Sequence, residues 1–401
     1  MGRSDINDEA SAASPVAPIP TDDSSRQLER GIALCLSGGG YRAMLFHVGA
    51  IWRLYEAGLL KRIDRISSVS GGSITAGVLG LAWANLSFDV TKTASDFVPH
   101  VVSPVRALAR ETIDSNAILL GLVLPGKISD RVTAAYDEYL FHGATLQDLP
   151  DEPRFVLNAT NVQSGALWRF MKPYMRDYRV GEVKQPTIPL ATAVAASSAF
   201  PPVLSPVEMR IAPDSFTPDS GDLQEEPYTS RVILSDGGVY DNLGLETAWK
   251  RYKTIFVSDG GGKLEPEPEP KNDWARHAYR VLNLIDNQVR SLRKKQLIGS
   301  YRASPSDANH REGAYWGIRT DVADYDLGNA LPCPHDRTME LAATPTRLKR
   351  LDDHLQERLI NWGYAVCDAA LRKHVDRTLP TPAGFPYRTV PAGFPYRTVG
   401  V

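Results

Sequence analysis

One serine, Ser70, has the sequence context of a nucleophile. It lies in Ser68-Val69-Ser70-Gly71-Gly72, between an apolar run at residues 63–69 and a Gly- and Ala-rich run at residues 74–85. This order predicts a strand, a sharp turn and a helix, which expose a serine hydroxyl near a helix N-terminus that favours a developing anion. The usual motif is G-x-S-x-G, and Ser68 replaces its first glycine. A turn that only packs a helix onto a strand has the same pattern, so Ser70 needs further support.

Three glycines, Gly38, Gly39 and Gly40, follow another apolar run. Glycines between a strand and a helix let backbone N–H groups converge on an anion, either a nucleotide phosphate or the oxyanion of an acyl-transfer reaction. The nucleotide alternative lacks G-x-x-x-x-G-K-[ST], and the spacing is not that of G-x-G-x-x-G. The oxyanion interpretation needs a nucleophile on a neighbouring strand, which Ser70 supplies. Arg42, at the same helix start, would steady the loop or attract an anionic head group.

A carboxylate, Asp236, follows the apolar run at residues 231–234 and precedes two glycines. A carboxylate at the carboxyl end of a strand faces the crevice in which α/β proteins bind ligands. An aspartate before two glycines is also a common turn, and Asp259 stands in a second copy of the pattern. Asp236 is therefore the candidate base, and Asp259 is its rival.

A Ser-acid-His triad is an alternative, because a late histidine completes the site of α/β-hydrolases. We interpret His47, one turn into the helix after the glycines, as a packing residue. The later histidines do not lie in recognisable loops at strand ends. They are His277, His310, His335, His354 and His374.

Three motifs, in this order, resemble those of the patatin-like phospholipase family, in the superfamily of patatin and cytosolic phospholipase A2. They are Ser37-Gly-Gly-Gly-Tyr-Arg-Ala43, Ser68-Val-Ser-Gly-Gly72 and Asp236-Gly-Gly-Val-Tyr-Asp-Asn242. The first is closer to the cytosolic phospholipase A2 version, and residues 195–201 resemble a segment that these proteins carry before the aspartate motif. The resemblance covers residues 31–245 and suggests a bacterial-type member.

The resemblance implies a lipid acyl hydrolase that cleaves (lyso)phospholipids or related lipids through an acyl-enzyme, with a Ser-Asp dyad and no cofactor or metal. Ser70 would be the nucleophile and Asp236 the base. Because the free pKa of aspartate is only about 3.9, we expect burial to raise the pKa of Asp236. The alternative is a catalytically inactive acyl-lipid-binding or scaffold protein on the same fold. The oxyanion loop would comprise Gly38, Gly39, Gly40 and Arg42.

The apolar runs alternate with helical patterns, which predicts an α/β fold with a central, mostly parallel sheet flanked by helices on both sides. We expect one domain over residues 29–380, with the motifs in residues 31–245 and a helical C-terminal part at residues 273–376. Residues 1–28 have the composition of a disordered tail. Residues 381–401 contain a nine-residue unit twice in succession and are predicted to be flexible or loosely packed.

Three further segments carry predictions about the surroundings of the site. Thr344-Pro345 predicts a helix start, followed by an apolar core stripe as far as Trp362. A lid over the site would come from residues 97–127 or 212–228. Residues 274–297 predict a long helix with a basic face that is either solvated or in contact with anionic lipid. The basic residues are Arg290, Arg293, Lys294 and Lys295.

The composition limits the class of protein. The 401 residues have a hydrophobic fraction of 43% and a net charge of −2, values of a soluble globular protein without the basic field that binds nucleic acid. The three cysteines are far apart, which favours a reducing compartment. No signal peptide is visible, and the apolar runs are too short to span a bilayer. We therefore expect a cytoplasmic protein that meets a membrane, if at all, from its surface.

Overall fold

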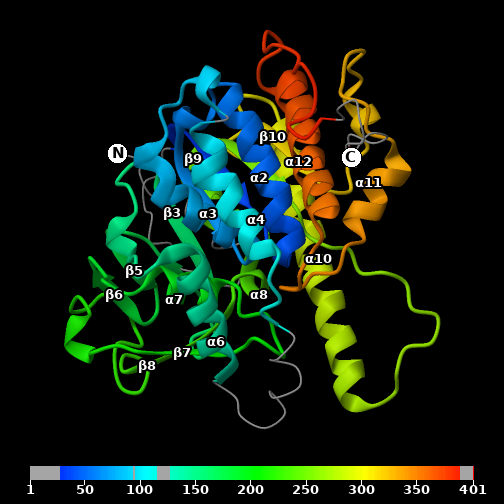
Figure 1. Ribbon diagram of the computed structural model, residues 1–401. Coiled ribbons are helices and arrows are strands. Elements are labelled where there is room, and N and C mark those ends of the chain that lie inside the picture. Colours follow the sequence, from blue (N-terminus) through cyan, green and yellow to red (C-terminus); the bar gives the residue numbers. More distant parts are fainter. Residues whose placement is uncertain (1–27, 94, 115–126, 389–400) are drawn as a thin grey trace.

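A ten-stranded sheet forms the centre of the molecule (Figure 1). The computed structural model describes residues 28–93, 95–114, 127–388 and 401. Within these residues the strands are β1 (Glu29–Leu36), β2 (Ile63–Val69), β3 (Arg154–Asn161), β4 (Ala166–Phe170), β5 (Tyr174–Asp177), β6 (Gly181–Lys184), β7 (Val207–Arg210), β8 (Arg231–Asp236), β9 (Tyr252–Asp259) and β10 (Glu312–Gly317).

The strands follow the order β10-β9-β1-β2-β3-β4-β5-β6, with β8 paired to β3 and β7 paired to β8. From β10 to β3 all neighbours are parallel, whereas β4 to β8 pair antiparallel. The prediction of a central, mostly parallel sheet is confirmed, and the parallel part carries the glycine loop and Ser70, whereas Asp236 ends the antiparallel β8.

Helices cover both faces of the parallel half. The α-helices are α2 (Gly40–Glu56), α3 (Gly71–Ala82), α4 (Ser103–Ala109), α6 (Lys127–Tyr136), α7 (Leu190–Ser197), α8 (Gly238–Asp241), α9 (Glu246–Trp249), α10 (Trp274–Arg302), α11 (His335–Ala342) and α12 (Asp353–His374).

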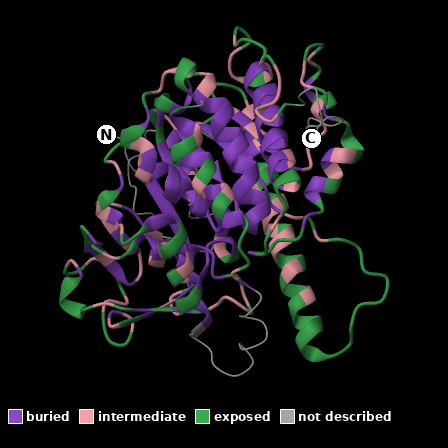
Figure 2. Cartoon of the chain, in the orientation of Figure 1, coloured by how far each residue is buried: buried purple, intermediate pink, exposed green. Residues whose placement is uncertain are grey.

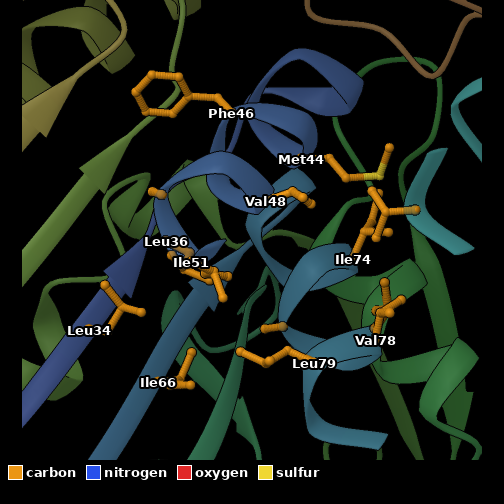
Figure 3. Close-up of a cluster of buried hydrophobic side chains, with 14 of the residues drawn as sticks. Leu34, Leu36, Met44, Phe46, Val48, Ile51, Ile66, Ile74, Val78 and Leu79 are labelled. Carbon is orange, nitrogen blue, oxygen red and sulfur yellow. The ribbon is translucent and has the colours of Figure 1, made fainter. Parts of the chain in front are cut away.

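The apolar run in β1 explains the two covered faces. Side chains alternate between the faces of a strand, and Leu34 and Leu36 lie in the large core with α2 and α3 (Figure 3). Ala33 and Cys35 lie in a second cluster on the other face, together with Leu297 of α10. The continuous apolar run therefore supplies both cores of a three-layer α/β arrangement.

Helices α2 and α12 lie in close contact because each carries a glycine at the crossing. A methyl group at Gly49 of α2 would collide with the carbonyl oxygen of Ile360 in α12. A methyl group at Gly363 of α12 would likewise collide with the carbonyl oxygen of Phe46. The backbones therefore approach to a distance that a larger residue at either position would prevent.

The helix start predicted at Thr344-Pro345 is wrong. Helix α12 begins at Asp353, and Asp352 caps it by accepting a hydrogen bond from the Leu355 N–H at 2.9 Å. Residues 344–351 instead use their backbone groups in contacts with other segments. The carbonyl of Arg347, for example, accepts a 3.0 Å hydrogen bond from the Tyr41 N–H beside the glycine loop. These tertiary contacts replace the hydrogen bonds that an earlier helix start would form.

The two tails fall partly outside the described residues. Residues 1–27 of the predicted N-terminal tail lie outside the described residues. Residues 389–400, which include the whole second copy of the C-terminal repeat, also lie outside them. In the first copy, the backbone of Tyr387 exchanges two hydrogen bonds with the Asn361 side chain, at 2.9 and 3.0 Å. The Tyr387 ring also lies under the Arg106 guanidinium. The described part of the first copy, residues 382–388, thus packs on α12, which differs from the loose end that we expected.

The predicted long helix is present as α10, and its first half projects from the body of the molecule (Figure 1). Figure 2 shows this half as mostly exposed, in contrast to the buried helices over the sheet. Trp274, at its N-terminus, is 84% exposed. In the part of the chain that the structure describes, no helix combines the length and apolarity needed to cross a bilayer.

Candidate active site

Two strands bring Ser70 and Asp236 together by meeting end to end. Strand β2 pairs with β3 as far as Val69, opposite Asn158. Strand β8 pairs with the next residues of β3, beginning with Asp236 opposite Ala159, and runs in the opposite direction. The carboxyl ends of β2 and β8 therefore face each other on one edge of β3. Asp236 thus reaches this position from an antiparallel strand.

Ser70 occupies a strained turn between β2 and α3. Its φ of 52° and ψ of −120° lie in a region that residues with a side chain seldom adopt. The two residues after Ser70 must be glycines for the backbones to approach this closely. Methyl groups at Gly71 and Gly72 would collide with the carbonyl oxygens of Gly40 and Leu36. The Ser70 side chain is only 8% exposed. This geometry is the sharp strand-to-helix turn expected from the motif.

A hydrogen-bonded network of serines fixes the turn. The Ser70 N–H donates a 3.1 Å hydrogen bond to Ser197 Oγ, which itself donates to the carbonyl of Asn158 at 2.6 Å. Ser73 Oγ lies 2.8 Å from Ser197 Oγ and 3.0 Å from Ser68 Oγ. Ser68, which replaces the usual glycine, is therefore part of the network that fixes Ser70. Sequence reasoning included Ser197 only within residues 195–201 and assigned it no role.

Asp236 is buried, and its environment favours the protonated form. Burial raises the pKa of its carboxyl group to about 7, although the N–H of Gly238 and the hydroxyl of Ser70 act in the opposite direction. Asp236 Oδ1 accepts the Gly238 N–H at 2.7 Å. Its Oδ2 is buried without a hydrogen-bond partner among the described residues. One oxygen thus anchors the carboxyl group while the other remains available to a proton donor such as Ser70.

The glycine loop offers two free backbone donors rather than three. The N–H of Gly38 donates a 3.0 Å hydrogen bond to the carbonyl of Asn242, so it is already used. Gly39 and Gly40 have positive φ values of 148° and 59°, and their N–H groups have no partner among the described residues. A side chain at Gly40 would come within 2.7 Å of the Arg347 carbonyl oxygen. The loop therefore requires glycine to hold its shape.

Arg42 braces the loop instead of facing Ser70. Its guanidinium group donates to the carbonyl of Gly260 at 3.1 Å and to the carbonyl of Thr344. Burial, together with the nearby charges of Arg290 and Arg319, lowers its pKa to about 10. Of the two roles considered for Arg42, these contacts match the steadying of the loop.

His47 and Asp259 are both engaged in other contacts. The Nε2 of His47 donates to the carbonyl of Ser37 at 2.9 Å, and its Nδ1 lies 2.8 Å from Ser258 Oγ. Burial lowers the His47 pKa to about 4, so the ring is neutral. Asp259 accepts hydrogen bonds from the Tyr315 hydroxyl at 2.8 Å and from a backbone N–H. Neither residue lines the cleft at Ser70.

A cleft of about 510 Å³ opens over Ser70 and Asp236. None of the eight histidines of the chain lines it, which counts against a histidine triad. Of the two candidate lids, residues 212–228 do not line the cleft. The other candidate, residues 97–127, contributes Asp114 to the lining, and its residues 115–126 lie outside the described part. The other walls are the glycine loop, residues 200–204, 262–265 and 346–348, and one face of α10.

The predicted basic face of α10 is largely turned toward the body. Arg290 lies 3.6 Å from Asp259, and Arg293 donates to Glu246 at 3.0 Å. Lys294 lies 4.4 Å above the Tyr315 ring. Lys294 and Lys295 are nevertheless exposed, so the prediction of a solvated or lipid-binding basic face is wrong for Arg290 and Arg293 only.

Comparison with known proteins gives a family match. A family model described as patatin-like phospholipase matches residues 34–249, more than half of the chain. Comparison with curated protein sequences gives no match. No group of three or more His, Cys, Asp or Glu side chains in the described residues is placed to hold a metal ion.

Among solved structures, human GIVD cytosolic phospholipase A2 is similar, with a TM-score of 0.50 and 12% identity over 86% of this chain and 61% of that one. Its complex with methyl gamma-linolenyl fluorophosphonate gives a TM-score of 0.50 and 12% identity over 88% and 59%. VipD from Legionella pneumophila gives a TM-score of 0.36 and 16% identity over 87% and 67%. The human comparisons concern the fold alone, and this chain spans about three fifths of that protein.

Proposed function

This chain belongs to the patatin-like phospholipase family, and from that premise we propose that it cleaves carboxylic esters of phospholipids, lysophospholipids or related lipids with a dyad of Ser70 and Asp236. The observation that carries the proposal is the meeting of β2 and β8. It places a serine in a strained turn beside a buried carboxyl group with a pKa of about 7. A carboxylate with a pKa near neutrality is a far better base than a free aspartate.

In the proposed reaction, ionised Asp236 accepts the Ser70 Oγ proton through Oδ2 as Oγ bonds to the acyl carbonyl carbon. The carbonyl oxygen becomes an oxyanion, which the free N–H groups of Gly39 and Gly40 stabilise by roughly 3 kcal/mol for each donor. Collapse of the tetrahedral intermediate breaks the ester C–O bond, and Asp236 returns its proton to the leaving alcohol. Water then attacks the acyl-enzyme by the same steps, which releases the fatty acid and restores Ser70.

The first test compares wild type, Ser70→Ala and Asp236→Asn on a lysophospholipid and a short-chain ester. We expect Ser70→Ala to reduce kcat/KM by at least about a thousandfold and to abolish labelling by a fluorophosphonate probe. Asp236→Asn should reduce kcat/KM by about a hundredfold or more, because it removes the general base. Circular dichroism of each variant confirms that the fold is retained.

Two outcomes would contradict this assignment. A loss with Asp259→Asn as large as that with Asp236→Asn would show that the wrong carboxylate was chosen. A wild-type protein that neither turns over nor reacts with the probe, yet binds acyl lipid, would support the alternative of an inactive lipid-binding or scaffold protein.

We further propose that the protein contacts the lipid surface through the exposed side of α10. Five exposed apolar residues lie on one side of this helix, within an arc of about 100° at 3.6 residues per turn. They form the α10 stripe: Trp274, Val281, Leu282, Ile285 and Leu292. The opposite side of the same helix lines the cleft with Asn283 and Asn287. An apolar stripe with an exposed tryptophan is typical of helices that lie in a membrane interface.

A further inference from the structure

A second, smaller hollow of about 180 Å³ adjoins the catalytic cleft and is strongly basic. Four cationic side chains line it, against a single carboxylate, Asp259. Both hollows are lined by Gly262, Lys263, Asn287 and Arg290, so they lie side by side. The cations of this basic hollow are Lys263, Arg290, Lys294 and Arg319.

The one carboxylate in the basic hollow is already satisfied. Asp259 accepts hydrogen bonds from Tyr315 and from the N–H of Gly261, and Arg290 lies 3.6 Å away. Burial alone would raise the Asp259 pKa, but Arg290, Gly261 and Tyr315 outweigh it and hold the pKa below its usual value. Asp259 therefore stays ionised and balances one of the four cations.

The remaining positive charge is incompletely compensated. The Nε atoms of Arg290 and Arg319 are buried without a hydrogen-bond partner among the described residues. Within the same residues, Lys263 and Lys294 form no ion pair, although Arg319 pairs with Glu265 at 2.8 Å. Buried donors without partners and like charges at close range both cost free energy, which a bound anion would recover.

Arg42 adds to this excess from behind the hollow. It is only 3% exposed, and its Nη2 is buried without a partner among the described residues, 3.1 Å from where a methyl group on Gly262 would lie. The charges of Arg290 and Arg319 are close enough to lower its pKa. The positive charge gathered at this place would attract an anion.

We propose that the basic hollow binds the phosphate group of a phospholipid headgroup while the acyl ester lies at Ser70. Guanidinium and ammonium donors recognise phosphate through charge-assisted hydrogen bonds. The hydroxyl groups of Ser291, Thr320 and Tyr315 also line the hollow and make it unsuitable for an acyl chain. The inference rests on the proposed hydrolase function and specifies its substrate as a lipid with a phosphate next to the ester-bearing glycerol.

A matched pair of substrates tests this directly. 1-Acylglycerol 3-phosphate and 1-acylglycerol with the same acyl chain differ only in the phosphate. For Lys294→Gln and Arg319→Gln we expect the ratio of kcat/KM between the phosphorylated and the neutral substrate to fall about tenfold, mainly through KM, since each variant removes one charge-assisted contact. Lys295→Gln, on the same helix but outside the hollow, is the control and should leave the ratio at the wild-type value. An unchanged ratio in both hollow variants would overturn the inference.

A binding measurement separates this inference from the hydrolase proposal. By calorimetry, Ser70→Ala protein should bind glycerol 3-phosphate, and the added substitution Lys294→Gln should weaken that binding about tenfold. If wild type hydrolyses neither substrate but this binding is seen, the anion site stands and the hydrolase proposal fails. If inorganic phosphate binds while the substrate ratio is unchanged, the hollow holds free phosphate and the headgroup inference is overturned. Absence of binding with an unchanged ratio would overturn it as well.

Discussion

At the scale of single residues, the pKa of Asp236 determines how activity should depend on pH. In the proposed role of base, Asp236 must be ionised, and burial raises its pKa to about 7. Below that pH the carboxyl group is protonated and cannot accept the Ser70 proton. We therefore expect kcat/KM for a soluble short-chain ester to fall about tenfold for each pH unit below about 7 and to level off above it.

The same shift has a consequence for stability, with the opposite sign to the usual case for aspartate. Because the folded state holds the Asp236 proton more tightly than the unfolded chain does, this residue destabilises the fold progressively as the pH rises from about 4 to about 7. Asp236→Asn removes this pH-dependent loss of stability, because the amide carries no charge to bury at neutral pH.

The pH dependence of activity also tests the role of Asp236. An acid limb of the wild-type pH–rate profile centred near pH 4 instead of 7 would contradict that role.

The sequence proposed the residues that the structure brings together at the cleft, but it did not reveal their hydrogen-bond partners. Ser70, Asp236 and the glycines could be proposed because they stand in short local motifs. The hydrogen bonds from Gly38 to Asn242 and from Arg42 to Thr344 join segments about 200 and 300 residues apart. No local sequence pattern indicates such contacts. For that reason only the structure shows which N–H groups of the proposed oxyanion loop are free of other partners.

At the scale of elements, the crossing of α2 and α12 sets a strict size limit. A methyl group at Gly363 would collide with the backbone carbonyl of Phe46, which cannot move without shifting α2. We expect Gly363→Ala to lower the free energy of unfolding by about 2 to 3 kcal/mol, as overpacking of a buried site does. Chemical denaturation of wild type and variant measures the difference.

Gly299 in α10 is the matched control for Gly363. It is also a helical glycine, but a methyl group there meets nothing within 4 Å. Gly299→Ala should therefore raise stability by about 0.5 to 1 kcal/mol through helix propensity and the lower entropy of the unfolded chain. If both substitutions changed stability by the same amount in the same direction, the close contact of α2 and α12 would not be the cause.

The existence of most elements could be predicted, but not the way in which they are joined. The apolar run before Asp236 correctly indicated a strand, β8, because burial requires apolar residues whichever way the strand runs. Its antiparallel direction depends on pairing with β3, which is about 75 residues away. The start of α12 was misplaced for a related reason. The capping preference of Thr344-Pro345 is worth about 1 kcal/mol, and the tertiary hydrogen bonds of residues 344–351 outweigh it.

At the scale of the whole molecule, α10 lines the cleft on one side and is exposed to solvent on the other. One side of the helix lines the cleft and the basic hollow, and the α10 stripe lies on the other side. Figures 1 and 2 show that the first half of the helix projects from the body and is mostly exposed. The sequence showed the length and basic residues of this helix. Which side faces the body depends on the sheet and loops around it, so its orientation could not be predicted. A helix with its apolar side in solvent indicates a partner, and for the proposed lipid hydrolase the substrate surface is the partner that matches this side.

The α10 stripe should therefore control binding to vesicles. Ile285 is 51% exposed and Leu292 is 61% exposed, so each has apolar area to bury in a lipid interface. We expect Ile285→Ser and Leu292→Ser each to weaken co-sedimentation with phosphatidylcholine vesicles about tenfold, from the loss of about 1.5 kcal/mol of apolar burial. As a control, Leu284→Ser changes an exposed leucine on the same helix but to one side of the stripe, and it should have a much smaller effect.

Because the stripe faces away from Ser70, hydrolysis of a soluble short-chain ester should be retained in these variants. Equal loss of vesicle binding in all three variants would show that general surface apolarity, not the stripe, determines the contact.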